Sequence, residues 1–416
     1  MANSKKNKAN GLLTHNLTVK NGRLHINNVD TIRLAEEYGT PIYVMDRSLV
    51  AENLNKYKLA FEKYYQGDSK VCYASKSFMT DIMINIVNDE NCCLDVSSGG
   101  EISMALMSDF PAERMFFHGN NKSISELGLA VVHNVGYIMV DNLTELENLN
   151  KIAASSNKIV NVIPRIKPGI EVDTHSYIQT GHIDSKFGEP FSIDYIKKIL
   201  SFKNLKLVGL HCHIGSLIHG TEPFAEDVRV MTKYMKVIKD ELSYDLTYLC
   251  LGGGFGIRYL ESDEYTEYEE YIRVICEEVK SKCMEYDLAL PTITIEPGRS
   301  ISGPAGITLY TVGAIKEIPQ TGTKYVLIDG GMADNPRYAL YKSKYTAVVA
   351  NKVDKPKDDV ITLAGKTCES GDLLGENMPI QKCEVGDIVA VLATGAYNHS
   401  MSSNYNMLPK PEVIYI

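Results

Sequence analysis

The chain has 416 residues, of which 44% are apolar and 23% charged, a composition typical of folded globular proteins that excludes wholesale disorder. At roughly 150 residues per domain, this length predicts two or three domains. With 43 Lys and Arg against 52 Asp and Glu, the formal net charge is -9, so there is no general basic surface for binding nucleic acid.

The nine cysteines contain no CxxC pair and no repeated metal-ligand spacing, which favours reduced thiols over a zinc site or a disulfide framework. The first ten residues, MANSKKNKAN, are polar and basic. No later apolar run approaches the roughly 20 residues that a membrane-spanning helix needs. We therefore expect a cytoplasmic protein without membrane contact.

The first predicted element is a β-hairpin near the N-terminus. In residues 17–26, LTVKNGRLHI, an Asn-Gly pair is flanked by alternating apolar residues. This pattern indicates a tight turn between two strands. We expect residues 1–45 to contribute to a β domain formed mainly by the C-terminal part of the chain.

The central part of the chain alternates short apolar runs with helical stretches. Runs that end in Gly, Ser, Asn or Asp begin at eight positions: Val71, Cys92, Met115, Gly136, Val160, Leu207, Thr247 and Thr292. Between them, apolar residues three and four apart predict helices, among them 144–154, 193–202, 225–242 and 268–284. Eight such units over about 250 residues match a closed (β/α)8 barrel of parallel strands.

A doubly wound open sheet is the rival architecture. The count of eight favours the barrel, and so do the polar residues at the C-terminal ends of the runs, where barrels assemble their active sites. Any single one of these polar residues could be an ordinary turn residue. We expect an α/β fold whose (β/α)8 barrel covers residues 46–304.

After residue 304 the pattern changes to β-type runs with few helical stretches between them. These runs begin at Ile307, Lys324, Tyr345, Val360, Asp387 and Pro411. They predict a second, mostly antiparallel β-barrel or sandwich domain over residues 305–416.

Lys76, in the segment VCYASKSF, lies at the end of the first predicted barrel strand among small and apolar residues. Desolvation at such a place lowers the pKa of a lysine and yields an amine that can form a Schiff base with an aldehyde. Taken alone, such a residue is more often a lysine whose charge reaches the rim of the barrel.

Gly252, Gly253 and Gly254 close the seventh run. Consecutive glycines let backbone N–H groups converge on an anion, and phosphate sites in such barrels use the loops after strands seven and eight. The eighth run ends in EPGR, residues 296–299, a second turn that could face a phosphate. A glycine cluster by itself is more often a tight turn.

His211 and His213 project from the same face of a strand, which raises the possibility of zinc binding. No third ligand has suitable spacing, so we predict no metal and favour an imidazole packed against a flat ring. Glu296 suits a basic ring nitrogen, because a carboxylate keeps a pyridinium protonated; alternatively it forms an ion pair with Arg299. An aldehyde, a phosphate and a basic ring nitrogen together describe pyridoxal 5′-phosphate (PLP).

Ten short motifs in a fixed order carry a resemblance to a known family. They are YASKSF at 73, DVSSGGE at 95, HGNNKS at 118, TGHIDSKFG at 180, GLHCHIGS at 209, LGGGFGIRY at 251, EPGRS at 296, DGGMADNPRYALY at 329, CESGD at 368 and GAYNHSMSSNYN at 395. From about Pro41 to its end, the chain resembles the PLP-dependent decarboxylases of the alanine-racemase fold, and most closely the diaminopimelate decarboxylases.

The resemblance implies a set of cofactor-binding residues. Lys76 matches the lysine that holds PLP as a Schiff base, His213 the imidazole stacked on the PLP ring, and Glu296 the acid on the ring nitrogen. Further positions that match contacts to the cofactor or its phosphate are Asp95, Ser216, Gly253, Gly254, Gly298, Arg299 and Tyr397.

The resemblance also implies substrate contacts and a shared site. Arg299, Arg337 and Tyr341 match positions that hold the distal carboxylate of the substrate, with Tyr397 beside them. Three further residues, Cys368 as proton donor, Glu369 as partner of the distal ammonium and Ser370, resemble a segment that enters the neighbouring subunit's site. Lys186 and Asp372 resemble a pair that bridges two subunits. A head-to-tail homodimer is therefore the expected active unit.

The activity implied is PLP-dependent decarboxylation of meso-2,6-diaminopimelate to L-lysine and CO2, the last step of lysine biosynthesis. One alternative is a sister decarboxylase acting on ornithine, lysine, arginine or a carboxylated polyamine, which Arg337 and the CESGD motif disfavour. A non-catalytic PLP-binding protein would be expected to lose Lys76, Cys368 or the glycines. The Cys368 segment and the large β domain disfavour an amino-acid racemase.

Overall fold

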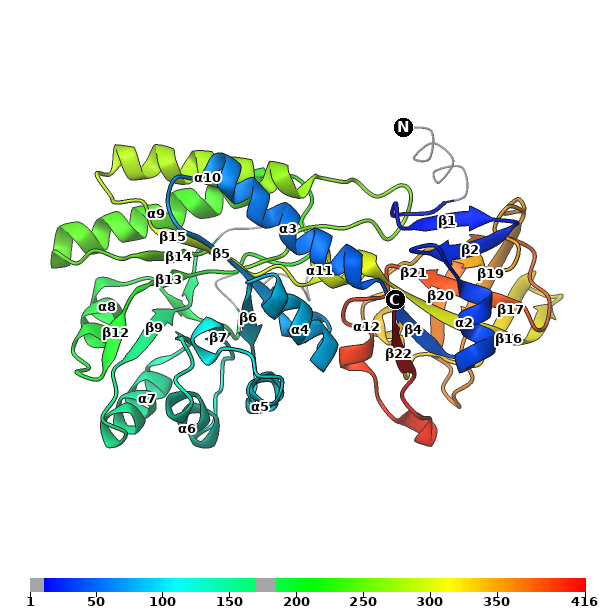
Figure 1. Cartoon of the computed structure of the whole chain (residues 1–416), viewed down its shortest axis with the longest axis horizontal. Coiled ribbons are helices and arrows are strands. Elements are labelled where there is room, and N and C mark those ends of the chain that lie inside the picture. The colour runs from blue at the N-terminus through cyan, green and yellow to red at the C-terminus, as the bar shows by residue number, and fades with distance from the viewer. Residues whose placement is uncertain (1–10, 170–184) are drawn as a thin grey trace. The chain divides into compact units, whose positions relative to one another are not determined.

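The computed structural model describes residues 11–169 and 185–416, so residues 180–184 of the TGHIDSKFG motif lie outside the described residues. The chain divides into two compact units. The barrel unit comprises residues 51–256 and 265–298, and the β unit comprises residues 1–50, 257–264 and 299–416. Figure 1 shows both units with their elements labelled.

The barrel unit is built around a parallel sheet that closes on itself. Its strands are β5 (Ser69–Ala74), β6 (Cys93–Val96), β7 (Met115–Phe117), β8 (Tyr137–Val140), β9 (Val160–Pro164), β12 (Leu205–Leu207), β13 (Gly209–His211), β14 (Tyr248–Cys250) and β15 (Thr292–Ile295). β15 pairs with β5, β12 with β9, and β13 with β14. Because Val208 alone separates β12 from β13, the two act as one interrupted strand, and the predicted barrel of eight parallel strands is confirmed.

Helices alternate with the barrel strands, the first of them before β5, and most begin at a side-chain cap. They are α3 (Arg47–Tyr64), α4 (Asp81–Asp89), α5 (Gly99–Met107), α6 (Ile124–Val132), α7 (Leu143–Ser155), α8 (Ile193–Leu200), α9 (Glu222–Leu242) and α10 (Tyr268–Glu285). The hydroxyl of Ser98 accepts from Glu101 N, and Asn142 Oδ1 accepts from Glu145 N. Such caps satisfy N–H groups that a helix leaves without a partner at its start. The four helices predicted from apolar spacing are present.

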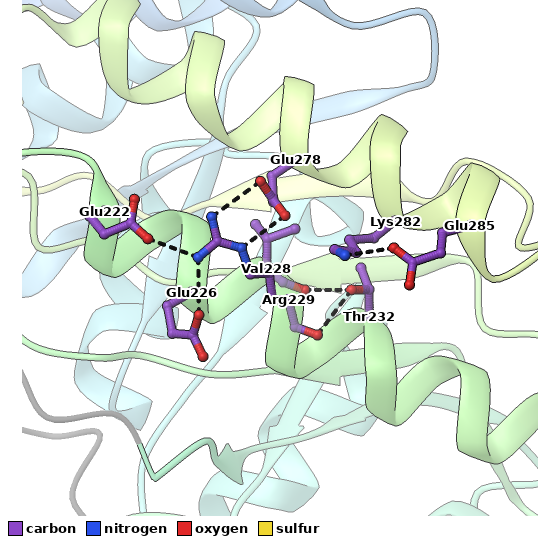
Figure 2. A network of polar contacts seen from close by, with 8 residues as sticks. All are labelled: Glu222, Glu226, Val228, Arg229, Thr232, Glu278, Lys282 and Glu285. Carbon is purple, nitrogen blue, oxygen red and sulfur yellow. Dashed lines mark hydrogen bonds and ion pairs between the residues drawn. The ribbon is translucent and has the colours of Figure 1, made fainter.

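Helices α9 and α10 are joined on their outer faces by a cluster of ion pairs around Arg229 (Figure 2). The guanidinium of Arg229 lies 2.8 Å from Glu222, 3.1 Å from Glu226 and 3.0 Å from Glu278 of α10. Its side chain is 36% exposed, so water screens these contacts and each contributes at most about 1 kcal/mol. The cluster fixes how the two helices face each other more than it stabilises the barrel.

A buried ion pair ties the loop after β7 to α7. Lys122 Nζ lies 2.8 Å from Glu145 Oε1 and also donates to the carbonyl oxygens of Gly119 and Met139. The side chains of Lys122 and Glu145 are 1% and 3% exposed. Removal of one partner would therefore leave a charge buried without compensation.

Replacing Lys122 by methionine is expected to lower the free energy of unfolding by about 3–5 kcal/mol, measured by urea denaturation. Lys63→Met, which breaks an exposed ion pair with Glu269, is the matched control and should leave the free energy of unfolding almost unchanged, because water screens this pair. Adding Glu145→Leu to Lys122→Met should recover most of the loss, because both charges are then gone. Equal losses for the buried and the exposed lysine would contradict this account.

The β unit contains a mixed, mostly antiparallel sheet, as predicted. Its strands are β4 (Ile42–Met45), β16 (Gly306–Ile318), β17 (Thr323–Ile328), β18 (Ala347–Val349), β19 (Asp359–Ala364), β20 (Leu373–Ile380), β21 (Ile388–Leu392) and β22 (Glu412–Tyr415). The long strand β16 pairs antiparallel with β17, β21 and β4, whereas the β17–β19 and β22–β4 pairs are parallel. Short helices flank it, α2 (Thr31–Tyr38), α11 (Arg299–Ser302) and α12 (Arg337–Tyr341).

The N-terminal hairpin forms as predicted. β1 (Leu17–Lys20) pairs antiparallel with β2 (Arg23–Ile26), and Asn21 and Gly22 between them both have positive φ. The chain then reverses, and β2 also pairs antiparallel with β3 (Val29–Asp30). Leu17, Leu24 and Ile26 pack into the same hydrophobic cluster as strands β4, β16 and β21.

Strand β20 has no counterpart among the predicted runs. Its sequence, LLGENMPI, contains Gly, Asn and Pro, which strands normally avoid. It pairs with β19 across register shifts, and Asn377 has a φ of 51°.

The described part of the chain has no helix with the length and apolar character to span a lipid bilayer.

Candidate active site

Lys76 is presented at the C-terminal end of the barrel strands. β5 ends at Ala74, and a short 3-10 turn, η1 (Ser75–Ser77), carries the lysine out of the strand. Its Nζ lies 4.0 Å from Oδ2 of Asp95, at the end of the neighbouring strand β6. Asp95 is 1% exposed, and burial raises the pKa of its carboxyl, although the charges of His118 and Lys76 act in the opposite direction. The structure thus brings the predicted lysine and its predicted acid together.

Glu296 follows β15 and lies between two imidazoles. His211 Nε2 donates to Glu296 Oε2 at 3.1 Å, and His118 Nε2 lies 3.1 Å from Oε1. All three residues are buried. Burial opposes ionisation of Glu296, but the two imidazoles outweigh it and hold its pKa well below the ordinary value. Glu296 is therefore a carboxylate at neutral pH, while burial lowers the pKa of His211 to about 4 and keeps that imidazole neutral.

These distances also bear on the question of zinc. The donor atoms of His118, His211 and Glu296 lie within 4.8 Å of one another. His211 thus has two potential metal ligands beside it that the spacing in the sequence could not reveal. The separations of 3.1 Å are those of imidazole–carboxylate contacts. His213, the other histidine of the motif, has a different partner.

His213 is held by the glycine-rich segment. The backbone N–H of Gly253 donates to His213 Nδ1 at 3.1 Å. A Cβ on Gly252 would lie 2.5 Å from the same nitrogen, and a Cβ on Gly253 would lie 2.2 Å from the carbonyl oxygen of Glu296. The glycines thus allow close packing of three loops. The Gly253 amide is engaged by the imidazole in this structure, and the roles of Gly253, Gly254 and the turn after Glu296 in holding a phosphate stay predictions.

That turn lies against the lysine. Ala74 N donates to the carbonyl oxygen of Pro297 at 3.1 Å. A Cβ on Gly298 would lie 2.9 Å from Ala74 Cβ and 3.0 Å from Ser77. Any larger side chain at Gly298 would push the lysine turn away. Ser216, in the loop after β13, is half-buried in the same unit.

The residues of the barrel unit fit PLP. Glu296 Oε1 is buried and forms no aligned hydrogen bond with a described residue, although His118 Nε2 lies 3.1 Å away, so it can accept from a protonated ring nitrogen. Lys76 offers an amine for an aldehyde, and Gly298 keeps open a space that a Cβ would fill. An amine, a carboxylate, an imidazole and glycine-rich turns in one barrel mouth match the chemical groups of this cofactor.

A second cluster of predicted residues lies in the β unit. Arg299 and Arg337 are 4% and 5% exposed. Their guanidinium carbons lie 4.6 Å and 5.5 Å from the centroid of the Tyr397 ring, and Arg337 also lies 5.3 Å from that of Tyr341. Arg299 donates to the hydroxyl of Tyr259 at 2.6 Å. The structure therefore gathers all four predicted residues of this group around two buried positive charges.

The CESGD segment lies on the surface of the β unit. Cys368, Glu369 and Ser370 are exposed, and Cys368 N donates to Oδ1 of Asn406. Asp372 behaves differently because it is 3% exposed. Its Oδ1 accepts from Met332 N and its Oδ2 from the amide and hydroxyl of Thr367, so both oxygens are engaged within the β unit. Asp372 thus organises the base of the exposed segment. Its pairing with Lys186 of another subunit stays a prediction; within the chain the Lys186 ammonium lies 5.0 Å from the centroid of the Phe187 ring.

Comparison with known proteins agrees with this chemistry. A family profile described as pyridoxal-dependent decarboxylase, pyridoxal binding domain, matches residues 47–303. The chain belongs to this family. It is therefore a PLP-dependent decarboxylase by descent, with the amine, carboxylate and glycine turns described above inside the matched region.

Two curated relatives of this decarboxylase match over nearly their whole length. The diaminopimelate decarboxylase of Bacillus methanolicus is 45% identical over 399 residues, covering 95% of this chain and 92% of the relative. That of Bacillus subtilis is 44% identical over 401 residues, covering 95% and 91%. The crystal structure of M. jannaschii diaminopimelate decarboxylase in co-complex with L-lysine is similar with a TM-score of 0.89 at 33% identity, covering 96% of this chain and 92% of the other.

A more distant structure shares the fold. The lysine/ornithine decarboxylase of Vibrio vulnificus, complexed with putrescine, matches with a TM-score of 0.78 at 20% identity and covers 93% of this chain and 97% of the other. At this identity the likeness shows the two-part architecture alone. The substrate of this decarboxylase must be argued from its own residues.

Three residues of the decarboxylase site carry no role predicted from the sequence: His118, Glu101 and Arg165. Glu101, in the first turn of α5, accepts from Ser97 N at 2.5 Å, and burial raises the pKa of its carboxyl. The Arg165 guanidinium lies 4.4 Å from the centroid of the Phe187 ring. His118 and Arg165 directly follow strands β7 and β9, and that position is the signal that could have marked them.

Proposed function

We propose that the protein decarboxylates meso-2,6-diaminopimelate to L-lysine and CO2 with PLP as its cofactor. The observation that carries this proposal is the buried arginine cluster of the β unit. Arg337 is 5% exposed, and its Nε has no hydrogen-bond partner among the described residues. A buried guanidinium calls for an anion, and a carboxylate can satisfy it with two parallel hydrogen bonds.

The substrate chemistry fits this demand. Diaminopimelate carries an amine and a carboxylate at each end, so one end can react while the other is held. Lysine and ornithine have an amine alone at the distal end and would leave the Arg337 charge without a partner. A site built to bind a charged group rejects analogues that lack it by large factors. The names of the two Bacillus relatives and the bound L-lysine of the M. jannaschii structure support the same choice.

Each predicted site residue of the chain would have a separate role in this reaction. Lys76 would hold the cofactor through its aldehyde and yield that position to the amine of the substrate. Glu296 would keep the ring nitrogen protonated, and His213, fixed by Gly253, would pack against the ring. When bound, the cofactor supplies a sink for the electron pair that departing CO2 leaves behind. Arg299 and Arg337 would orient the substrate so that the correct carboxylate faces this sink.

We also propose that two copies of the chain share their active sites head to tail. The exposed CESGD segment supports this, because Cys368, Glu369 and Ser370 are free to reach a neighbouring subunit. In this arrangement Cys368 of one subunit would return a proton to the carbon that has lost CO2 in the other. Glu369 would pair with the distal ammonium of the substrate.

The proposal is tested by measuring CO2 release in parallel from meso-, LL- and DD-diaminopimelate, lysine and ornithine. We expect release from the meso compound, with kcat/KM for lysine and ornithine lower by roughly 10⁴-fold because the arginines are then left unpaired. Release from ornithine but none from meso-diaminopimelate would assign the protein to the diamine-forming decarboxylases. A PLP-loaded protein that releases no CO2 from any of the five would be a binding protein.

A further inference from the structure

His118 occupies a place in the barrel unit that links two carboxylates. It directly follows β7, and its backbone N–H donates to the carbonyl oxygen of Val96 at 2.7 Å, next to Asp95 on β6. This bond extends the β6–β7 pairing by one residue and fixes the imidazole over Asp95. The side chain is 9% exposed, so its position is set by the protein and not by solvent.

The contacts of His118 involve both ends of the cofactor site. Its Nε2 lies 3.7 Å from Oδ1 of Asp95 and 3.1 Å from Oε1 of Glu296. Asp95 in turn lies 4.0 Å from the ammonium of Lys76. A continuous series of charged and polar groups therefore runs from Lys76 through Asp95 and His118 to Glu296.

Three atoms that face one another in this series can share a proton. Oδ1 of Asp95, Nε2 of His118 and Oε1 of Glu296 are buried, and none forms an aligned hydrogen bond with a described residue. A single imidazole N–H can be donated to one carboxylate at a time. Occupation of one carboxylate by this N–H therefore changes the environment of the other.

We propose that His118 is a positioning residue that couples Asp95 to Glu296, so that protonation at the lysine end of the site depends on the state of the ring-nitrogen end. The proposal rests on the roles proposed above for Asp95 and Glu296. Besides His118, three charged or titratable residues act on the two carboxylates: Lys76 after β5, Arg165 after β9 and His211 on β13. Glu296 itself also acts on Asp95.

His211 provides a matched control on the same carboxylate. It is also a buried histidine, and its Nε2 lies 3.1 Å from Glu296, the same distance as His118. The two rings lie 5.0 Å apart at an interplanar angle of 71°. No ion pair joins His211 to Asp95 among the described residues. Loss of His211 should thus affect Glu296 alone, whereas loss of His118 should affect both carboxylates.

The experiment compares His118→Gln with His211→Gln by two readouts. Pyridoxamine 5′-phosphate has the ring nitrogen and phosphate but no aldehyde, so its dissociation constant from the PLP-free protein reports on Glu296. The pH midpoint of the visible absorbance of the PLP-loaded protein reports on the lysine end. Both variants should weaken pyridoxamine phosphate binding by roughly tenfold, since each loses an imidazole nitrogen that lies 3.1 Å from the Glu296 carboxylate.

Only His118→Gln should also shift the visible midpoint, downward by about one pH unit. Without the imidazole, Asp95 holds its proton more readily and stabilises the positive charge at Lys76 less. In an Asp95→Asn background, the added His118→Gln change should no longer shift the midpoint. Equal midpoints for His118→Gln and His211→Gln, or a shift that persists in full in Asp95→Asn, would overturn the coupling.

A measurement without histidine variants covers the case in which His118→Gln fails to load PLP. In the PLP-free protein labelled with ¹⁵N-histidine, the His118 signals should move in both Asp95→Asn and Glu296→Gln, and the His211 signals in Glu296→Gln alone. His118 signals that respond to neither change would refute the coupling. Failure of the proposed function is separate, because it would show as no CO2 release from meso-diaminopimelate by the unmodified protein, whereas the coupling is read from the histidine signals and the visible midpoint.

Discussion

Replacing Lys76 by alanine is expected to abolish the visible absorbance of the PLP-loaded protein and to reduce turnover by roughly 10⁴-fold or more, as removal of a covalent catalytic group does. The reason is the position of this amine. Lys76 lies on the η1 turn directly after β5, and its Nζ is 4.0 Å from the buried carboxyl of Asp95. Among the described residues, Lys76 is the one lysine that forms an ion pair with Asp95.

Lys70→Ala is the matched control, because Lys70 lies on the same strand but before its C-terminal end. It should retain both the absorbance and the turnover. Pyridoxamine 5′-phosphate should still bind to Lys76→Ala, since Glu296 and the Gly298 turn do not depend on the amine. A Lys76→Ala protein with normal turnover, or with an unchanged visible band, would remove the basis of the proposed mechanism.

The fold could be predicted well where a pattern is local. Each barrel strand is a short apolar run closed by a polar residue or glycine, and each predicted helix has apolar residues three and four apart, so periodicity alone located them. β20 was not predicted, because its Gly375, Asn377 and Pro379 are residues that strands avoid. In the structure, pairing with β19 outweighs that preference. Strand pairing is non-local, and a single sequence does not display it.

The site could be predicted in part for a related reason. Lys76 and Glu296 each follow a barrel strand, and Asp95 lies near the C-terminal end of another; the three strands, β5, β15 and β6, are neighbours in the sheet. Their proximity therefore follows from topology once the barrel is assumed. The Gly253 amide that holds His213, and the position of His118 between two carboxylates, depend on distances of a few ångströms that no spacing rule supplies.

Arg337→Lys is expected to lower kcat/KM for meso-diaminopimelate by roughly 30- to 5,000-fold, because truncating one partner of a buried charge pair costs about 2–5 kcal/mol. Lysine keeps the positive charge but cannot form the two parallel hydrogen bonds of a guanidinium. The visible absorbance with PLP should be unchanged, since no residue of the barrel unit is altered. Arg33→Lys, an exposed arginine of α2 in the same unit, should leave kcat/KM as it is.

Inhibition by L-lysine separates substrate recognition from chemistry at Arg337. The product keeps the amine and carboxylate of the distal end, so a residue that binds this end should bind product and substrate alike. The inhibition constant for L-lysine should therefore rise in Arg337→Lys by a factor similar to the fall in kcat/KM. A large fall in kcat/KM with unchanged inhibition by L-lysine would mean that Arg337 acts on the reacting end, and the buried guanidinium would then need a different anion from the one proposed.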